Sequence, residues 1–275
     1  MGFRFRLASF LVAALVTVQV LTAGLVYSVT RHQLIDEGKR QLGISASAFG
    51  RQLDDISARV AASVQVLALD YALRSAIAQR DQATLRSALA NHGRRVGAVR
   101  MQLIDTDGHI EADTLPVAGQ QEFAYRDLLE RGYEKPSAAV VSWQGRAYWV
   151  VAVPVFAPDL VGVIAATLPL DDAMLARLQT QSVLPKTIEL VSREGKGWRV
   201  LASGASKVPI SSALGAAGAS LPEQARLVNV DGREYLAQAV PLNRTSSSGA
   251  VDAVLAYSVD EALQPYRAVA TAWAG

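Results

Sequence analysis

The chain has 275 residues, of which 51% are apolar and 19% are charged, and its formal net charge is +2. A charged share below the roughly 25% of soluble domains favours a membrane segment, and scattered Lys and Arg residues without a dense stripe argue against nucleic acid as a partner. The chain has no cysteine, which excludes disulfides, thiol nucleophiles and cysteine-bound zinc.

The N-terminus contains the clearest local signal. Arg4 and Arg6 precede an uncharged run of 24 residues, from Leu7 to Thr30. About 20 apolar residues span a bilayer as a helix, and preceding arginines favour a cytoplasmic N-terminus. We therefore predict a cytoplasmic segment at 1–6 and a transmembrane helix at 7–30, in contact with the lipid bilayer. The alternative is a cleaved signal peptide, whose apolar region is usually shorter.

Residues 31–80 predict one long amphipathic helix. Its apolar residues follow one another at steps of 7, 4, 3, 4, 4 and 3, which is helical spacing close to a heptad. They are Leu42, Phe49, Leu53, Ile56, Val60, Val64 and Leu67. This stripe either packs on its own domain or also pairs with a second copy, which would make a homodimer. Asp81 and Thr84 predict the cap of a following helix.

Short strands follow from Val99 onward, in two successive units. Each unit reads as two strands, a helix, three strands and a closing helix, with tight-turn signals at Asp107-Gly108, Gln144-Gly145 and Asp231-Gly232. The first unit covers residues 81–182 and the second covers residues 183–267. The fold class is therefore α+β, with a transmembrane helix that continues into the long helix and two antiparallel-sheet modules.

The two units repeat each other. GRAYWVVAVP at 145–154 and GREYLAQAVP at 232–241 lie 87 positions apart, and Leu103-Ile104 corresponds to Leu190-Val191 at the same offset. A period of 87 is longer than the roughly 20–50 residues of solenoid repeats. The sequence therefore predicts one small domain that is used twice.

A family resemblance rests on these residues. LIDTDGHIEADT and GRAYWVVAVPV in the first unit, and WRVLAS, GREYLAQAVPL and SVDEALQPYR in the second, follow the anchor and the long helix. The chain thus resembles, over nearly its whole length, the double Cache family of bacterial extracytoplasmic sensor domains. It looks most like the members ahead of HAMP and GGDEF or EAL domains, which make or break cyclic di-GMP.

The resemblance implies a structure and a location. Two PAS-like modules are expected outside the inner membrane, so that residues 31–267 are periplasmic. The first module would be membrane-distal and hold a small ligand. The second would be membrane-proximal, with residues 268–275 as the start of a truncated second membrane helix.

Two tryptophans are candidates for ligand binding in the first unit. Trp143 and Trp149 have no counterpart in the second unit, where Val230 and Leu236 stand at the same offset. Aromatic walls are common in small-molecule pockets, although buried aromatic residues more often belong to the core.

Arg146, Tyr148 and Asp113 complete the candidate ligand site. Arg146 and Tyr148 share one strand face because side chains alternate, and an arginine offers a planar fork for carboxylates. The pair recurs as Arg233 and Tyr235, so a structural role is the competing interpretation. Trp143, Arg146 and Tyr148 are also a loose echo of the amino-acid-binding pattern of some double Cache domains, with a different spacing.

The remaining motifs argue against catalysis and against a metal. Asp105, Asp107 and His109 surround the Asp-Gly hairpin signal, but the loop lacks the later ligands of a calcium loop, so a turn is expected. The sequence contains no G-x-S-x-G, H-E-x-x-H or P-loop motif. No catalytic residue, cofactor or metal site is predicted.

Three functions remain open from the sequence. The first is the small-ligand input region of a transmembrane signalling protein, for which a cyclic di-GMP cyclase or phosphodiesterase is the first expectation and a histidine kinase or a chemoreceptor is the alternative. The second is a stand-alone, membrane-anchored periplasmic binding protein. The third is a periplasmic enzyme, which the missing motifs disfavour.

Overall fold

The computed structural model describes residues 3–180, 185, 187–195, 197–205, 208–216, 220–242 and 250–264, with side chains from residue 10 onward. It contains one very long helix and two antiparallel sheets, each of five strands. The predicted α+β class and the two-module architecture are confirmed. The predicted start of a second membrane helix, residues 268–275, lies outside the described residues.

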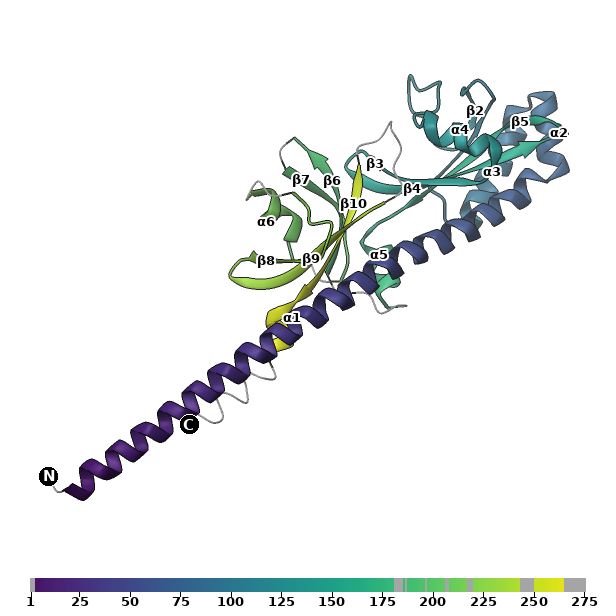
Figure 1. The fold of residues 1–275 in the computed structure, drawn as a ribbon. Coiled ribbons are helices and arrows are strands. Elements are labelled where there is room, and N and C mark those ends of the chain that lie inside the picture. The colour runs from purple at the N-terminus through teal and green to yellow at the C-terminus, as the bar shows by residue number, and fades with distance from the viewer. Residues whose placement is uncertain are drawn as a thin grey trace.

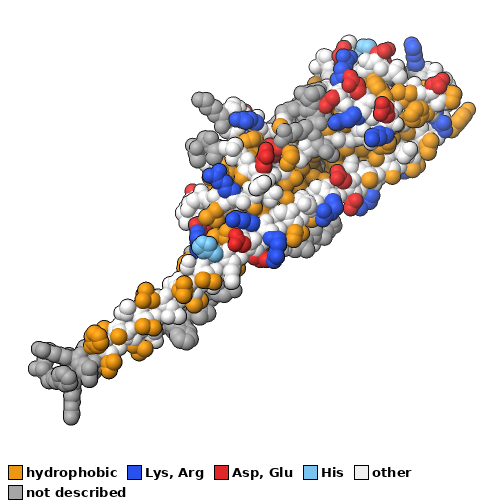
Figure 2. All heavy atoms as spheres, in the orientation of Figure 1, with side chains coloured by type: hydrophobic (Ala, Val, Ile, Leu, Met, Phe, Trp, Pro, Cys, Tyr) orange, Lys and Arg blue, Asp and Glu red, His pale blue; other side chains and the backbone are white. Residues whose placement is uncertain are grey.

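Helix α1 spans Phe3–Ala68 and extends along the whole molecule (Figure 1). Its N-terminal part projects beyond both sheets and carries apolar side chains over its visible surface (Figure 2). An 18-residue window of this part has a mean hydropathy of 2.1, and none of it is buried in the protein. Such a segment is a candidate membrane span, as predicted for residues 7–30.

The prediction of one helix as far as residue 80 is wrong in its extent. α1 ends at Ala68, and Asp70 accepts hydrogen bonds from the backbone N–H groups of Ala72 and Leu73 at the start of a new helix. Helix α2 spans Tyr71–Gln79, and Arg80 closes it in the left-handed region, with φ 53°. The chain therefore reverses at the far end of α1 because an aspartate caps the next helix there.

The expected cap of the next helix is confirmed. Asp81 Oδ1 accepts from the N–H groups of Ala83 and Thr84, and the Thr84 hydroxyl donates to Asp81 Oδ2. Helix α3 then spans Gln82–Val96 and ends at Gly97, which has φ 75°. The α2–α3 pair leads the chain back from the tip of α1 to the first sheet.

The two sheets share one strand order. The first is ordered β2-β1-β5-β4-β3 and the second β7-β6-β10-β9-β8. The strands of the first sheet are β1 (Arg100–Ile104), β2 (Ile110–Asp113), β3 (Ser137–Trp143), β4 (Arg146–Phe156) and β5 (Leu160–Pro169). Those of the second are β6 (Thr187–Glu194), β7 (Gly197–Ser203), β8 (Arg226–Val230), β9 (Arg233–Pro241) and β10 (Val251–Ser258). Identical orders confirm the predicted duplication.

The repeated turns adopt the same backbone geometry. Gln144 and Gly145 have φ 50° and 72°, and Asp231 and Gly232 have φ 50° and 78°. Two successive residues with positive φ make the hairpin turn that matches the twist of the flanking strands. The sequence repeat therefore preserves a β-hairpin in each module.

Three shorter helices complete the modules: α4 (Arg126–Glu134), α5 (Asp172–Thr180) and α6 (Ile210–Ala216). Helix α4 packs on the first sheet, α5 connects the two units and α6 packs on the second sheet. We call the part with β1–β5 and α2–α4 the distal module and the part with β6–β10 and α6 the proximal module, because the former lies farther along α1 from its apolar N-terminal end (Figure 1).

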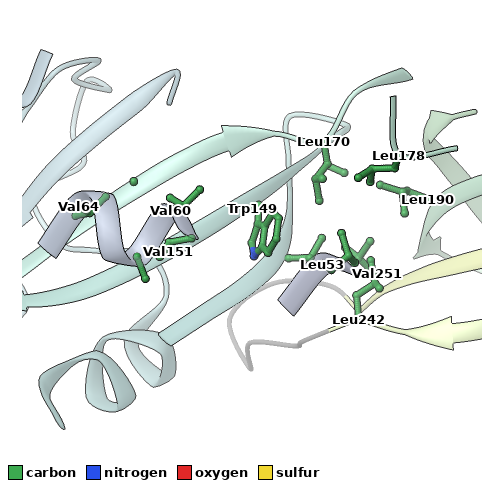
Figure 3. Packing of buried hydrophobic residues seen from close by; sticks show 14 of the residues in the cluster. Leu53, Val60, Val64, Trp149, Val151, Leu170, Leu178, Leu190, Leu242 and Val251 are labelled. Carbon is green, nitrogen blue, oxygen red and sulfur yellow. The ribbon is translucent and has the colours of Figure 1, made fainter. Parts of the chain in front are cut away.

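The main core lies between α1 and both sheets. Leu53, Val60 and Val64 of α1 face Trp149 and Val151 of β4, while Leu190, Leu242 and Val251 of the proximal module extend the same cluster (Figure 3). Six of the seven stripe residues are buried, and Ile56 is half-buried. The stripe therefore packs on the chain's own modules, as the first interpretation expected, and homodimerisation stays a prediction.

Candidate functional site

The two faces of the distal sheet have different coverings. One face packs on α1, and the opposite face, which we call the outer face, packs on α4 and on residues 114–125. Because side chains alternate along each strand, Met101 and Leu103 of β1 point toward α1 while Arg100 and Gln102 point to the outer face. The outer face is thus where polar groups gather.

The predicted site residues divide between the two faces. Trp143 and Tyr148 lie on the outer face, with their ring centroids 5.5 Å apart. Trp149 follows Tyr148 directly and therefore points to the α1 face, where it is buried in the main core (Figure 3). Arg146 pairs with Trp143 across the β3–β4 hairpin and is exposed. The structure brings Trp143 and Tyr148 together and places Trp149 elsewhere.

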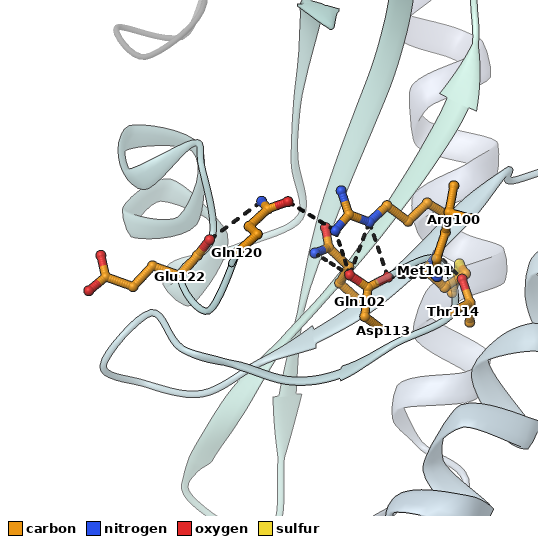
Figure 4. A network of polar contacts seen from close by, with 8 residues as sticks. Arg100, Met101, Gln102, Asp113, Thr114, Gln120 and Glu122 are labelled. Atoms are coloured by element: carbon orange, nitrogen blue, oxygen red, sulfur yellow. Dashed lines mark hydrogen bonds and ion pairs between the residues drawn. The ribbon is translucent and has the colours of Figure 1, made fainter. Parts of the chain in front are cut away.

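Asp113 is the acidic partner of a buried arginine. Arg100 Nε donates to Asp113 Oδ1 and Oδ2 at 3.0 and 3.1 Å, and Arg100 Nη2 also donates to Oδ2 (Figure 4). The side chains of Arg100 and Asp113 are only 7% and 8% exposed. Two parallel N–H···O contacts fix the plane of the guanidinium. Asp113 thereby orients Arg100.

Neighbouring amides extend this ion pair into a network. Gln102 Nε2 donates to Asp113 Oδ2 at 3.2 Å, and the backbone N–H of Leu115 donates to Oδ1 at 2.8 Å. On the other side, Arg100 Nη2 donates to Gln120 Oε1 at 3.1 Å (Figure 4). The network ties β1 and β2 to the covering segment 114–125.

A small hollow opens beside this network on the outer face. The centres of water-sized molecules can occupy ≈ 40 Å³ of it. The total empty volume, which includes the part open to solvent, is ≈ 400 Å³. Its lining consists of Arg100, Gln102, Gln120, Phe123, Ala124, Tyr125, Val141, Trp143, Tyr148, Val150 and Thr167. Each strand of the sheet except β2 contributes to it, and segment 114–125 forms its cover.

Aromatic rings form the walls of the hollow. The Arg100 guanidinium lies over Trp143, with Cζ 5.7 Å from the ring centroid, which is a cation–π distance. Phe123 and Tyr125 meet edge to face, with centroids 5.5 Å apart. Burial raises the pKa of the Tyr125 phenol, and the nearby Arg100 charge opposes this rise. Tyr125 therefore presents a neutral hydroxyl at physiological pH.

The β1–β2 hairpin holds the acidic cluster noted in the sequence. Asp105, Asp107 and His109 bring one ligand atom each within 4.8 Å of one another. Asp105 Oδ1 already accepts from the backbone N–H groups of Asp107 and His109, at 2.9 and 2.8 Å. The aspartate thus serves the turn that the sequence predicts.

The proximal module carries a different arrangement at the matching positions. Glu189 stands 87 residues after Gln102, and its Oε2 accepts from the backbone N–H and the hydroxyl of Ser211, at 2.9 and 2.6 Å. Ile210 and Leu214 of α6 pack on the same face. A hollow in which the centres of water-sized molecules can occupy ≈ 190 Å³ lies between α6 and the edge strand β8.

Sequence reasoning missed Arg100, Gln102 and Gln120 as site residues. The alternation along β1 places Arg100 and Gln102 on the polar face of a strand, which usually means solvent. Both are buried because segment 114–125 folds over them. A usable signal was the occurrence of an arginine and an aspartate on neighbouring strands joined by one hairpin.

Comparison with solved structures identifies the fold. The periplasmic domain of Vibrio cholerae LuxQ is 14% identical, with a TM-score of 0.52 and coverage of 79% of this chain and 99% of that chain. The ligand-binding domain of the Pseudomonas fluorescens chemoreceptor CtaA, in complex with L-leucine, is 17% identical, with a TM-score of 0.51 and coverage of 86% and 100%. At these identities the likeness shows a shared fold alone.

Sequence comparison gives the family. No curated protein matches the chain. A family model described as the double sensory domain of two-component sensor kinases matches residues 37–262, which include both modules and the C-terminal part of α1 from residue 37 onward. The chain therefore belongs to the double Cache family of sensor domains.

Proposed function

We propose that the chain is the extracytoplasmic input region of a bacterial transmembrane signalling protein, and that the outer-face hollow of the distal module binds a small molecule. The observation that carries this proposal is that Arg100, Trp143 and Tyr148 line one hollow, and that Arg100 is held there by a hydrogen bond to Gln120. A concave site with aromatic walls and a few oriented polar groups is the usual form of a small-molecule site.

The location follows from the candidate membrane span. With α1 anchored by residues 7–30 in the inner membrane, both modules would lie in the periplasm. The two arginines before the span support a cytoplasmic N-terminus.

The family description bears on the output. Since the matching model is described for two-component sensor kinases, a sensor kinase is the first candidate for the signalling partner domain, with a chemoreceptor next. This order favours the alternative over the cyclic di-GMP enzyme that the sequence suggested first. Reading the gene past codon 275 for a second apolar span and an output domain tests this order.

The ligand site is tested by thermal protection. The full chain, reconstituted in nanodiscs, is screened against organic acids, amines, amides and amino acids, with L-leucine included because CtaA was solved with it. We expect at least one compound to raise the unfolding temperature, because a ligand that binds only the folded state stabilises it.

A matched pair of variants assigns the site to one module. Trp143→Ala removes the ring over which Arg100 lies and should abolish the protection. Trp198→Ala removes the corresponding kind of contact in the proximal module, where Arg193 lies 5.6 Å from the Trp198 ring centroid, and should leave the protection intact. Protection that survives Trp143→Ala but is lost in Trp198→Ala would contradict the assignment.

A further inference from the structure

We propose that the distal hollow selects ligands without net charge that combine a flat ring with a hydrogen-bond acceptor. This inference rests on the proposed function, since it names the chemistry of that same site. The inference starts from the ion pair of Arg100 with Asp113 beside the hollow, because this pair has no net charge but keeps hydrogen-bond donors on the guanidinium.

The first step concerns charge. Among the lining residues only Arg100 carries a full charge, and Asp113 matches it at hydrogen-bonding distance. Both side chains are more than nine-tenths buried. A ligand with a net charge would lose its hydration on entering and would find no unmatched opposite charge to compensate. A neutral ligand avoids this cost.

The second step concerns ammonium groups. A carboxylate has about four lone-pair sites, and those of Asp113 receive Arg100 Nε, Arg100 Nη2, Gln102 Nε2 and the Leu115 N–H. Asp113 is therefore saturated. An amine or a zwitterionic amino acid would have to break this network to obtain a carboxylate partner, so the hollow disfavours both.

The third step concerns the donor that remains. The side-chain hydrogen bonds that Arg100 makes with the described residues use Nε and Nη2 and leave Nη1. An arginine has five N–H groups in a fixed fork. Nη1 thus offers directed donors, and a carbonyl oxygen or ring nitrogen on the ligand is the matching acceptor.

The fourth step concerns shape. Trp143 and Tyr148 on one side, and Phe123 and Tyr125 on the other, present aromatic surface around the hollow. Flat rings stack on or meet the edges of such side chains. With ≈ 40 Å³ accessible to the centres of water-sized molecules, the hollow suits a compact ligand of about one ring.

The test compares probes of one shape and different charge. In the first set nicotinamide is neutral, nicotinate is its anionic analogue and 3-(aminomethyl)pyridine is its cationic analogue. Benzamide, benzoate and benzylamine form a second set with the same three charges. Dissociation constants for the full chain in nanodiscs are measured by calorimetry. We expect the amide of at least one set to bind about tenfold or more tightly than its charged analogues.

Charge variants of the wall sharpen the test. Asp113→Asn leaves Arg100 unmatched and should shift the preference of the site about tenfold or more toward the carboxylates. The double variant Arg100→Gln with Asp113→Asn is neutral again and should lose the gain for carboxylates, and it keeps the test valid if the single variant does not fold. Asp107→Asn, in the exposed turn of the same module, is the matched control and should change nothing.

The outcomes separate the inference from the proposed function. Tighter binding of an anion, a cation or an amino acid than of every neutral probe overturns the inference and leaves a ligand site in place. If no compound of either experiment binds, the proposed function itself is contradicted. An unchanged preference in Asp113→Asn would likewise show that the ion pair does not set the selectivity.

Discussion

The distal and proximal modules share one strand order, but their outer faces carry different buried polar residues and different coverings. In the distal module Gln102 lies opposite Asp113, and in the proximal module Glu189 lies opposite Ser203. The buried carboxylate has thus moved from one strand of the pair to the other. In the distal module it orients Arg100 beside a hollow.

In the proximal module the carboxylate holds a helix. Glu189 accepts from Ser211 near the start of α6, whose Ile210 and Leu214 cover the sheet with apolar groups. No arginine contacts Glu189 among the described residues. The comparison teaches that a duplicated fold can leave a polar hollow on its outer face or fill that face with its own packing, by exchanging a few polar residues.

The largest effect is expected from breaking the distal ion pair. Asp113→Ala leaves the buried Arg100 charge without its partner, which typically costs about 3–5 kcal/mol of stability. Hydrogen exchange should rise in β1 and β2 and stay unchanged in β6 and β7. Asp107→Ala, in the exposed turn, should change stability by less than about 0.5 kcal/mol. Equal loss of protection in both modules would show that they unfold as one unit.

A smaller effect is expected where α1 meets the proximal sheet. A Cβ at Gly38 would lie 2.7 Å from Leu236 Cδ1, whereas a Cβ at Gly43 would meet nothing within 4 Å. Gly38→Val should therefore destabilise the protein by about 1–3 kcal/mol through overpacking. Gly43→Val, on the same helix, is the matched control and should be neutral or slightly stabilising. Denaturant midpoints measure both, and similar midpoints would contradict the close approach.

The smallest effect is expected from pH at the proximal carboxylate. Burial raises the pKa of Glu189 above its ordinary value of 4.5, although the hydrogen bonds from Ser211 oppose the rise. The folded state then binds the proton more tightly than the unfolded state, so stability falls as pH increases from 4.5 through the raised pKa.

The variant Glu189→Gln isolates this effect. It should remove the pH-dependent loss, so that the stability difference between variant and wild type changes in its favour as pH rises from about 4 to about 8. Glu261→Gln, at an exposed position, controls for the general loss of a carboxylate. A difference that is constant with pH would show that Glu189 titrates alike in the folded and unfolded states.

The sequence predicted the fold well where the pattern is local and repeated. Alternating strands, Asp-Gly and Gln-Gly turns and the offset of 87 indicated two equal modules. The break after Ala68 was missed because no glycine or proline marks it, and the end of α2 was missed because Arg80 takes the left-handed conformation that glycine usually adopts. The clue was Asp70, a helix-capping residue type within an otherwise helical pattern.

The candidate site was predicted only in part, because its completion depends on tertiary structure. The sequence analysis placed Arg146 and Tyr148 on one strand face, whereas Tyr148 and Trp149 are neighbours in a strand and cannot share that face. Arg100 became a site residue only when segment 114–125, which has no regular pattern, covered it. Periodicity assigns a side chain to a face, but it does not tell what covers that face.

Both modules pack on the same continuous helix, α1, which connects the distal module to the candidate membrane span. With 66 residues at about 1.5 Å each, α1 measures roughly 100 Å, and its described part has no interruption between the tip and the apolar end. Arg31 follows the candidate span directly, and its Nη2 donates to Oε1 of Glu234 in β9 at 2.7 Å. Because α1 continues from the distal module to the candidate span, a shift of the distal module along or around the helix axis would be carried toward that span.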